Sequence, residues 1–180
     1  MPKNIVVITG SPRVHGNSDS LAGAFIEGAK ASGNKVTRFD AGRMYIKGCN
    51  DCRYCFSNEG ECVIRDDMQE IYPALYEAEL LVLAGPVYWF GFTAQIKAMI
   101  DRMYAGSGKP YSIKSMGLIV ICGDSNEKVM DPTLLQFRAI CDYCGWEEIF
   151  VLTQNAVNEK GDVQKTDSIA KARALGEGIR

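Results

Sequence analysis

The sequence predicts an α/β domain built on a doubly wound, five-stranded parallel β-sheet with helices on both faces. Five short apolar segments are typical of strands, and they alternate with segments whose apolar residues recur at helical spacing. Parallel neighbours need crossover connections, which helices provide. Ligands of such sheets bind beyond the carboxyl ends of the strands, so we expect the functional loops along one edge.

Each expected strand is a short apolar or β-branched run, and each expected helix shows one apolar face. The expected strands are residues 5–9, 35–40, 80–84, 116–122 and 148–152. The expected helices run from Ser18 to before Gly33, from a cap at Asp66, through 96–103, over 133–143 and over 166–175. Residues 41–65 show neither period, and we interpret them as a cysteine-rich insertion in a single domain, 1–180.

Composition narrows the classes of partner. The net charge is −2 and the isoelectric point is about 5.5, which predicts no nucleic-acid partner. No apolar run approaches the roughly 20 residues that cross a bilayer, and the N-terminus resembles no signal peptide. We therefore predict a cytoplasmic protein with no membrane partner.

A glycine-bounded polar loop, residues 10–18, follows the first strand and leads into a helix, a pattern that presents backbone N–H groups to an anion. Ser11, Arg13, Asn17 and Ser18 supply side-chain donors suited to a phosphate monoester. The spacing matches neither a nucleotide triphosphatase loop nor a dinucleotide fingerprint. An ordinary turn with capping serine and asparagine is the alternative. The single histidine, His15, is expected to be solvent-exposed and is given no catalytic role.

Several motifs together resemble the NAD(P)H-dependent FMN reductase branch of the flavodoxin-like superfamily. They are the segments 10–13, 16–18 and 85–88, and Lys97 with 100–102. The resemblance implies a flavodoxin-like sheet of strand order 2-1-3-4-5. It also implies FMN as cofactor, with its phosphate at Ser11, Arg13, Asn17 and Ser18. It places the flavin ring against Pro86, Val87, Tyr88, Trp89, Phe90 and Gly91. The loop with Gly123 and Asp124 follows the fourth strand, and we expect it to reach the same edge and to contact the flavin.

The resemblance further implies an oxidoreductase that takes electrons from NAD(P)H and passes them to a quinone, a nitro or azo compound or another small acceptor. No catalytic side chain is expected, because the flavin carries the chemistry. The alternatives are an electron carrier that exchanges electrons with a ferredoxin and a non-enzymatic regulator on the same scaffold. Related proteins imply a homodimer or homotetramer.

Cys49, Cys52, Cys55 and Cys62 form a C-x2-C-x2-C-x6-C pattern. The spacing resembles that of iron–sulfur flavoproteins, a subgroup of the same family in which four cysteines hold a [4Fe-4S] cluster beside FMN. Free or redox-active thiols, a zinc site and disulfides remain open. We interpret Cys122 as a core residue, and Cys141 and Cys144 as buried or half-buried thiols.

Overall fold

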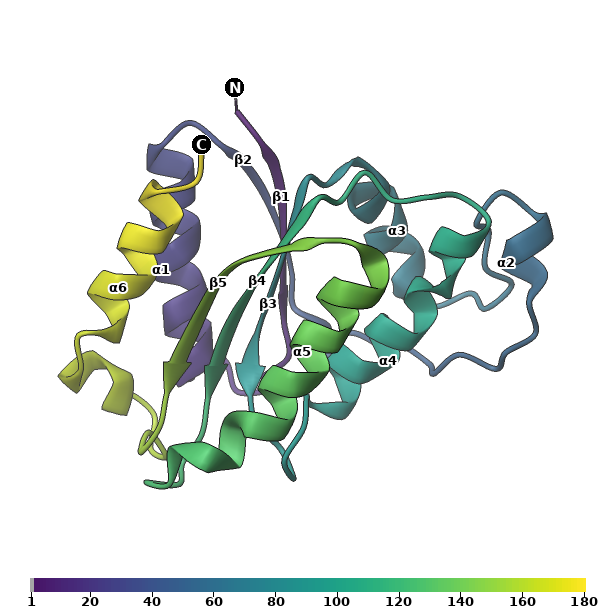
Figure 1. Ribbon diagram of the computed structural model, residues 1–180. Coiled ribbons are helices and arrows are strands. Elements are labelled where there is room, and N and C mark those ends of the chain that lie inside the picture. Colours follow the sequence, from purple (N-terminus) through teal and green to yellow (C-terminus); the bar gives the residue numbers. More distant parts are fainter. Residues whose placement is uncertain (1) are drawn as a thin grey trace.

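The computed structural model describes residues 2–180, which form a five-stranded, all-parallel sheet covered by helices on both faces (Figure 1). The strand order is β2-β1-β3-β4-β5, as predicted. The strands are β1 (Asn4–Thr9), β2 (Lys35–Phe39), β3 (Leu80–Pro86), β4 (Ser115–Ile121) and β5 (Glu147–Gln154). All of the paired strands run parallel, so their carboxyl ends meet at one edge of the sheet.

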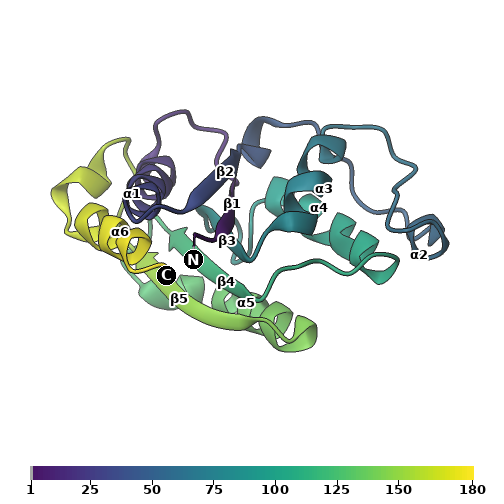
Figure 2. The same ribbon diagram turned by 90° about the horizontal axis from the view of Figure 1, so that it is seen from above.

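The helices divide between the two faces of the sheet. One face is covered by α1 (Asn17–Ala31) and α6 (Ser168–Glu177), and the other by α3 (Met68–Glu77), α4 (Ala94–Arg102) and α5 (Asp131–Cys144) (Figures 1 and 2). The short α2 (Tyr54–Ser57) lies at one end of the molecule, away from the sheet. Short 3-10 turns are η1 (Ala41–Arg43), η2 (Met103–Ser107), η3 (Glu127–Met130) and η4 (Asp162–Lys165).

Alternation along the central strands creates two separate cores. In β1, Ile5 and Val7 pack with Phe25 of α1 on one face. Val6 and Ile8 pack on the opposite face with residues of α3, α4 and α5. Because side chains alternate across a strand, a run of consecutive apolar residues serves both layers.

The five strands and the helices that cover the sheet lie where the sequence predicted them, with ends shifted by a few residues. The insertion is more structured than expected, since 41–65 contains η1 and α2. The helix expected to include Met103 ends at Arg102 and continues as the 3-10 turn η2. Within residues 2–180, no helix combines the length and hydrophobicity that a membrane span requires.

Close backbone approach fixes the loop after β1. A Cβ on Gly10 would lie 2.4 Å from Ile96 Cδ1 and 2.6 Å from Thr93 Oγ1, so only glycine fits beside the start of α4. A Cβ on Gly42 would lie 2.4 Å from the Ser11 carbonyl oxygen. These two glycines let η1 and α4 press the loop after β1 into place at the carboxyl edge.

Candidate functional site

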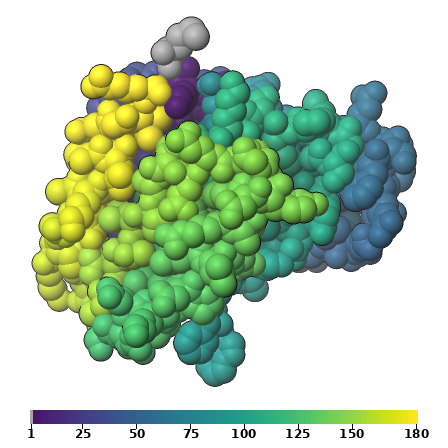
Figure 3. Space-filling model, viewed as in Figure 1, coloured from purple at the N-terminus to yellow at the C-terminus, as the bar shows by residue number. Residues whose placement is uncertain are grey.

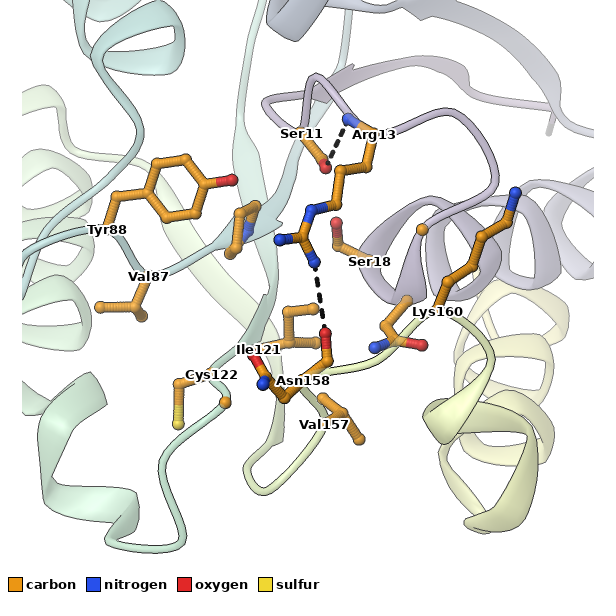
Figure 4. A pocket seen from close by; sticks show the side chains of 14 residues that line it. Ser11, Arg13, Ser18, Val87, Tyr88, Ile121, Cys122, Val157, Asn158 and Lys160 are labelled. Carbon is orange, nitrogen blue, oxygen red and sulfur yellow. Dashed lines mark hydrogen bonds between the residues drawn. The ribbon is translucent and has the colours of Figure 1, made fainter.

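A pocket of about 190 Å³ opens at the carboxyl edge of the sheet, and we call it the rim pocket (Figure 4). Loops that follow β1, β3, β4 and β5 supply its walls. Its lining residues are Ser11, Arg13, Gly16, Asn17, Ser18, Pro86, Val87, Tyr88, Ile121, Cys122, Gly123, Val157, Asn158 and Lys160. The lining contains two cationic side chains and no carboxylate, so the site favours an anion.

The loop after β1 holds its donors around the start of α1. The Ser11 hydroxyl accepts a hydrogen bond from the Arg13 backbone N–H at 3.2 Å, which closes the turn. Helix α1 follows Gly16, and no side chain caps this helix end in the described structure. The first N–H groups of α1 are therefore open to an anion, and Ser18 lies among them, 2% exposed.

The Arg13 side chain spans the rim pocket. Its guanidinium Nη1 donates to the Asn158 carbonyl oxygen at 3.2 Å, and Figure 4 shows it extending from the loop after β1 toward the loop after β5. The charged group thus stands over the uncapped end of α1. This arrangement suits a phosphate monoester, which accepts hydrogen bonds from a guanidinium and from backbone amides.

The Asn17 side chain was expected to donate to a phosphate, but its amide is bonded to the backbone of another loop. Its side-chain amide donates to the Glu159 carbonyl oxygen at 2.8 Å and accepts from the backbone N–H groups of Gly161 and Val163 at 3.1 and 3.3 Å. The side chain fastens α1 to the loop after β5. Asn17 still lines the rim pocket, where its helix position offers a backbone N–H.

The loop after β3 splits between the pocket and solvent. Pro86, Val87 and Tyr88 line the rim pocket, whereas Trp89 is 95% exposed and does not. Tyr88 and Gly91 exchange backbone hydrogen bonds of 3.0 and 3.1 Å, with Trp89 at φ 49° and Phe90 at φ 65° between them. Two aromatic residues in left-handed conformations are strained. In Figure 3, a segment in the teal of this part of the chain projects from the bottom of the molecule.

The remaining wall comes from the loops after β4 and β5. Gly123 lines the pocket, but Asp124 does not. Cys122 is buried as predicted, and burial raises the pKa of its thiol, so it forms a neutral, apolar part of the wall. Asn158 and Lys160 also line the pocket, and sequence reasoning missed them. The order of the elements could have indicated these two residues, because the loop after β5 begins at the same edge of the sheet as the loops after β1, β3 and β4.

Known proteins resemble this chain in both sequence and fold. The family model for NADPH-dependent FMN reductase matches residues 3–154. The chain belongs to this family. An iron–sulfur flavoprotein of Methanosarcina thermophila is 32% identical over 153 residues, which cover 84% of this chain and 78% of that protein.

A second relative and a solved structure are also similar to this chain. An iron–sulfur flavoprotein of Archaeoglobus fulgidus is 35% identical over 127 residues, 60% of this chain, and the match spans only 57% of that protein's length. The solved NAD(P)H:quinone oxidoreductase from Methanothermobacter marburgensis superposes with a TM-score of 0.77 over 98% of this chain and 96% of its own, at 17% identity. That structural match supports the flavodoxin-like fold.

The second notable region of this FMN reductase family member is a small pocket lined by all four clustered cysteines, which we call the cysteine pocket. It lies at the end of the molecule that carries α2 (Figure 1). Cys49 and Cys52 are exposed, and Cys55 and Cys62 are half-buried. Cys62, which is the most distant of the four in sequence, lines the same pocket as the other three.

The segment that carries these cysteines is tightly packed against the domain. A Cβ on Gly108 would lie 1.9 Å from the Cys55 carbonyl oxygen, and a Cβ on Gly60 would lie 2.1 Å from Tyr76 Oη. The Gly60 backbone N–H donates to the Cys55 carbonyl oxygen at 3.0 Å, and its own carbonyl accepts from Tyr76 Oη at 3.1 Å. The insertion is therefore packed against the domain by specific contacts.

The surroundings of Cys55 disfavour its thiolate form. Burial raises the pKa of Cys55, and the nearby thiols, Cys62 first, raise it further, so a positive charge in the cysteine pocket would favour the ionised form of this residue. The Asp51 backbone N–H donates to Cys49 Sγ at 3.4 Å. No three potential ligand side chains within residues 2–180 are placed to hold one metal ion.

A buried ion pair closes the base of the cysteine segment. Arg102, the last residue of α4, donates from Nη1 to Asp66 Oδ2 at 2.8 Å, and the two side chains are 1% and 0% exposed. Burial opposes the charge of Asp66, but hydrogen bonds from Arg102 and from the Lys47 backbone N–H hold its pKa below the usual value. Asp66 also accepts from the Met68 backbone N–H at 3.2 Å, as a capping residue does. The predicted Lys97–Asp101 pair is confirmed at 2.6 Å.

Proposed function

We propose that this protein binds FMN in the rim pocket and passes electrons from NAD(P)H to a small acceptor such as a quinone or a nitro or azo compound. The observation that carries the proposal is the anion site, where Arg13 stands over the uncapped start of α1. Membership of the NADPH-dependent FMN reductase family supports the FMN phosphate as the anion that binds there. The exposed side chain of His15 gives no sign of a role in the reaction.

Each wall of the rim pocket has a part in holding the cofactor. Ser11, Arg13, Ser18 and the backbone N–H of Asn17 would bind the phosphate, and Lys160 adds a second cation at the rim. Pro86, Val87 and Tyr88 would lie along the flavin ring, and Gly123 would border it. Trp89, Phe90, Gly91 and Asp124 lie outside the pocket lining, so their contact with flavin needs a closed loop or a second subunit.

When bound, FMN supplies the hydride and single-electron chemistry, and the protein supplies binding and orientation. No acidic side chain and no histidine lines the rim pocket, which agrees with a reaction that needs no protein acid or base. The aromatic tip, Trp89 and Phe90, is exposed, as expected of a surface that a second copy covers in a homodimer or homotetramer.

Titration of the purified protein with FMN, followed by flavin fluorescence, tests the binding step. We expect saturable binding at one site per chain, after which anaerobic mixing with NADPH or NADH bleaches the flavin absorbance rapidly. Failure to bind FMN, with the fold intact by circular dichroism, would refute the proposal. Bleaching by a reduced ferredoxin and by neither nicotinamide would refute the reductase and favour the second candidate.

The second candidate is an iron–sulfur electron carrier that exchanges electrons with ferredoxin-type partners through a [4Fe-4S] cluster and FMN. The cysteine pocket is the specific observation in its favour, because four thiols from one ordered segment line one space. Cys49, Cys52, Cys55 and Cys62 would be the ligands, and the N–H donor at Cys49 suits a charged sulfur. The pocket is small, about 20 Å³, so the exposed Cys49 and Cys52 would move outward on loading.

An anaerobic absorbance spectrum with iron and sulfide analysis tests the second candidate. We expect about four iron and four sulfide per chain after reconstitution, in addition to the flavin bands. Zinc without sulfide, or protein that takes up neither iron nor sulfide, would refute it and leave the FMN proposal standing.

A further inference from the structure

The Arg102 guanidinium leaves one buried donor without a partner. Nη1 donates to the Lys47 carbonyl oxygen at 3.0 Å as well as to Asp66, and Nη2 donates to the Ile64 carbonyl and Asp66 at 3.3 Å each. Nε is buried and has no hydrogen-bond partner within the described residues. Folded proteins rarely leave a charged group's N–H unpaired in the interior, so this donor calls for an acceptor.

The position of Arg102 links that donor to the cysteines. Arg102 lines the cysteine pocket together with Cys62 and the other three thiols. Its carbonyl partners, Lys47 and Ile64, each stand two residues outside the segment 49–62. Arg102 therefore donates to a carbonyl on each side of the segment, and its unpaired N–H belongs to a side chain that lines the cysteine pocket.

Asp66 fixes the direction of the guanidinium. It accepts from Nη1 and Nη2 of Arg102, while its own oxygens also accept from the Lys47 and Met68 backbone N–H groups at 2.9 and 3.2 Å. A guanidinium is planar, so a carboxylate bound across its Nη atoms determines which way Nε points. The pair is nearly solvent-free, and a hydrogen bond made there is not screened.

We propose that Arg102 is a positioning residue whose Nε–H donates to a sulfur of the iron–sulfur group held by Cys49, Cys52, Cys55 and Cys62, and thereby makes that group easier to reduce. The inference rests on the second candidate function, because it needs a cluster in the cysteine pocket. A hydrogen bond to sulfur stabilises the more negative, reduced form and raises the reduction potential. The donor belongs to α4, outside the cysteine segment.

The R102K variant separates the Nε donor from the ion pair. Lysine keeps a positive charge for Asp66 but has no N–H at the Nε position. The matched control is R65K, since Arg65 is an exposed neighbour whose guanidinium bonds only to Gln69, at 3.4 Å. All three proteins are reconstituted with ferrous iron and sulfide without oxygen, analysed for both elements, and titrated with redox dyes while the reduced cluster is followed by electron paramagnetic resonance.

We expect R102K to load the same iron and sulfide as the wild type and to bind FMN equally well. At a fixed potential, its ratio of reduced to oxidised cluster should fall by about tenfold, the scale of one hydrogen bond to a charged group. The cluster of R65K should have the same reduction potential as that of the wild type. If R102K takes up the full iron and sulfide and its cluster has the same reduction potential as that of the wild type, the inference about Arg102 is wrong although the protein holds a cluster. If the wild type takes up no iron and sulfide, both the inference and the second candidate function are wrong. Elemental analysis distinguishes the two results.

A measurement on the wild type decides the case in which R102K does not fold. The protein is labelled with ¹⁵N-arginine, reconstituted and reduced, and examined by pulsed electron paramagnetic resonance. We expect a ¹⁵N hyperfine coupling from one arginine nitrogen to the cluster, and its loss in a protein grown without the label. A loaded cluster with no arginine coupling overturns the inference.

Discussion

The rim pocket takes its walls from loops that follow four different strands, whereas the cysteine pocket takes its four thiols from the single segment 49–62. The parallel sheet itself assembles the first, because it brings the carboxyl ends of β1, β3, β4 and β5 together. The second is held against the domain by the buried Arg102–Asp66 ion pair and by contacts such as the hydrogen bond from Tyr76 of α3 to the Gly60 carbonyl.

The two regions also handle charge in opposite ways. The rim pocket presents Arg13, Lys160 and the start of α1, and thus attracts an anion. The cysteine pocket instead gathers four thiols, whose ionised forms would bear negative charge. One chain thus carries two separate candidate sites, one assembled by the topology of the sheet and one by a packed insertion. Variants that affect one pocket should spare the other.

Loss of a single cysteine should have the largest effect. We expect Cys62→Ser to abolish iron and sulfide uptake while leaving FMN affinity within about twofold, because the rim pocket shares no residue with the cysteine pocket. Iron, sulfide and flavin analysis of the reconstituted protein is the measurement. Cys144→Ser is the matched control, since Cys144 is an exposed thiol outside both pockets. Equal iron uptake by both variants would contradict the assignment of Cys62.

Breaking the buried ion pair should have the next largest effect. Asp66→Asn leaves Arg102 buried without a counter-ion, and we expect it to cost about 3–5 kcal/mol of unfolding free energy near neutral pH. Urea unfolding followed by circular dichroism measures the loss. Asp167→Asn is the control, because Asp167 pairs with Lys171 on the surface at 70% exposure and should change stability little.

The same variant should alter the pH dependence of stability. The folded pKa of Asp66 lies below the usual 3.8, so its stabilisation is present above about pH 4 and is lost as the pH falls through the folded pKa. The wild type should therefore lose stability on acidification more steeply than Asp66→Asn. Parallel acid limbs in urea titrations at pH 5 and below would contradict the role of this carboxylate.

Removal of the rim cation should have a smaller, local effect. We expect Arg13→Ala to weaken FMN binding by about 10- to 100-fold, the value of a hydrogen bond between charged groups that is partly open to solvent. Arg138→Ala is the control, because Arg138 pairs with Glu148 at 3.2 Å on the surface. Fluorescence titration with FMN and with riboflavin sharpens the result, since riboflavin has no phosphate and its affinity should be the same for both variants.

The strained tip should show the smallest effect. Phe90 has φ 65°, and replacement by glycine should stabilise the fold by up to about 1 kcal/mol, because glycine adopts this conformation without strain. Thermal unfolding compared with Phe56→Gly, at an aromatic residue outside this turn, measures the difference. Unchanged flavin reduction in Phe90→Gly would show that Phe90 has no part in the reaction.

The sequence by itself determined the fold in outline and indicated residues of both pockets. Continuous apolar runs such as 5–9 predicted buried parallel strands, and the glycine-bounded loop 10–18 predicted an anion site at the first helix. Both follow from local patterns, because strand and helix periodicities and turn residues act over a few neighbouring positions. The cysteine spacing likewise identified the thiols that line one pocket.

Only the tertiary structure decided the long-range contacts. It directed the Asn17 amide to the loop after β5, brought Asn158 and Lys160 to the rim pocket, and left Trp89 in solvent. It also joined Asp66 to Arg102, whose separation of 36 residues no local pattern spans. These contacts depend on how loops far apart in the chain pack against one another, which the sheet order limits but does not fix.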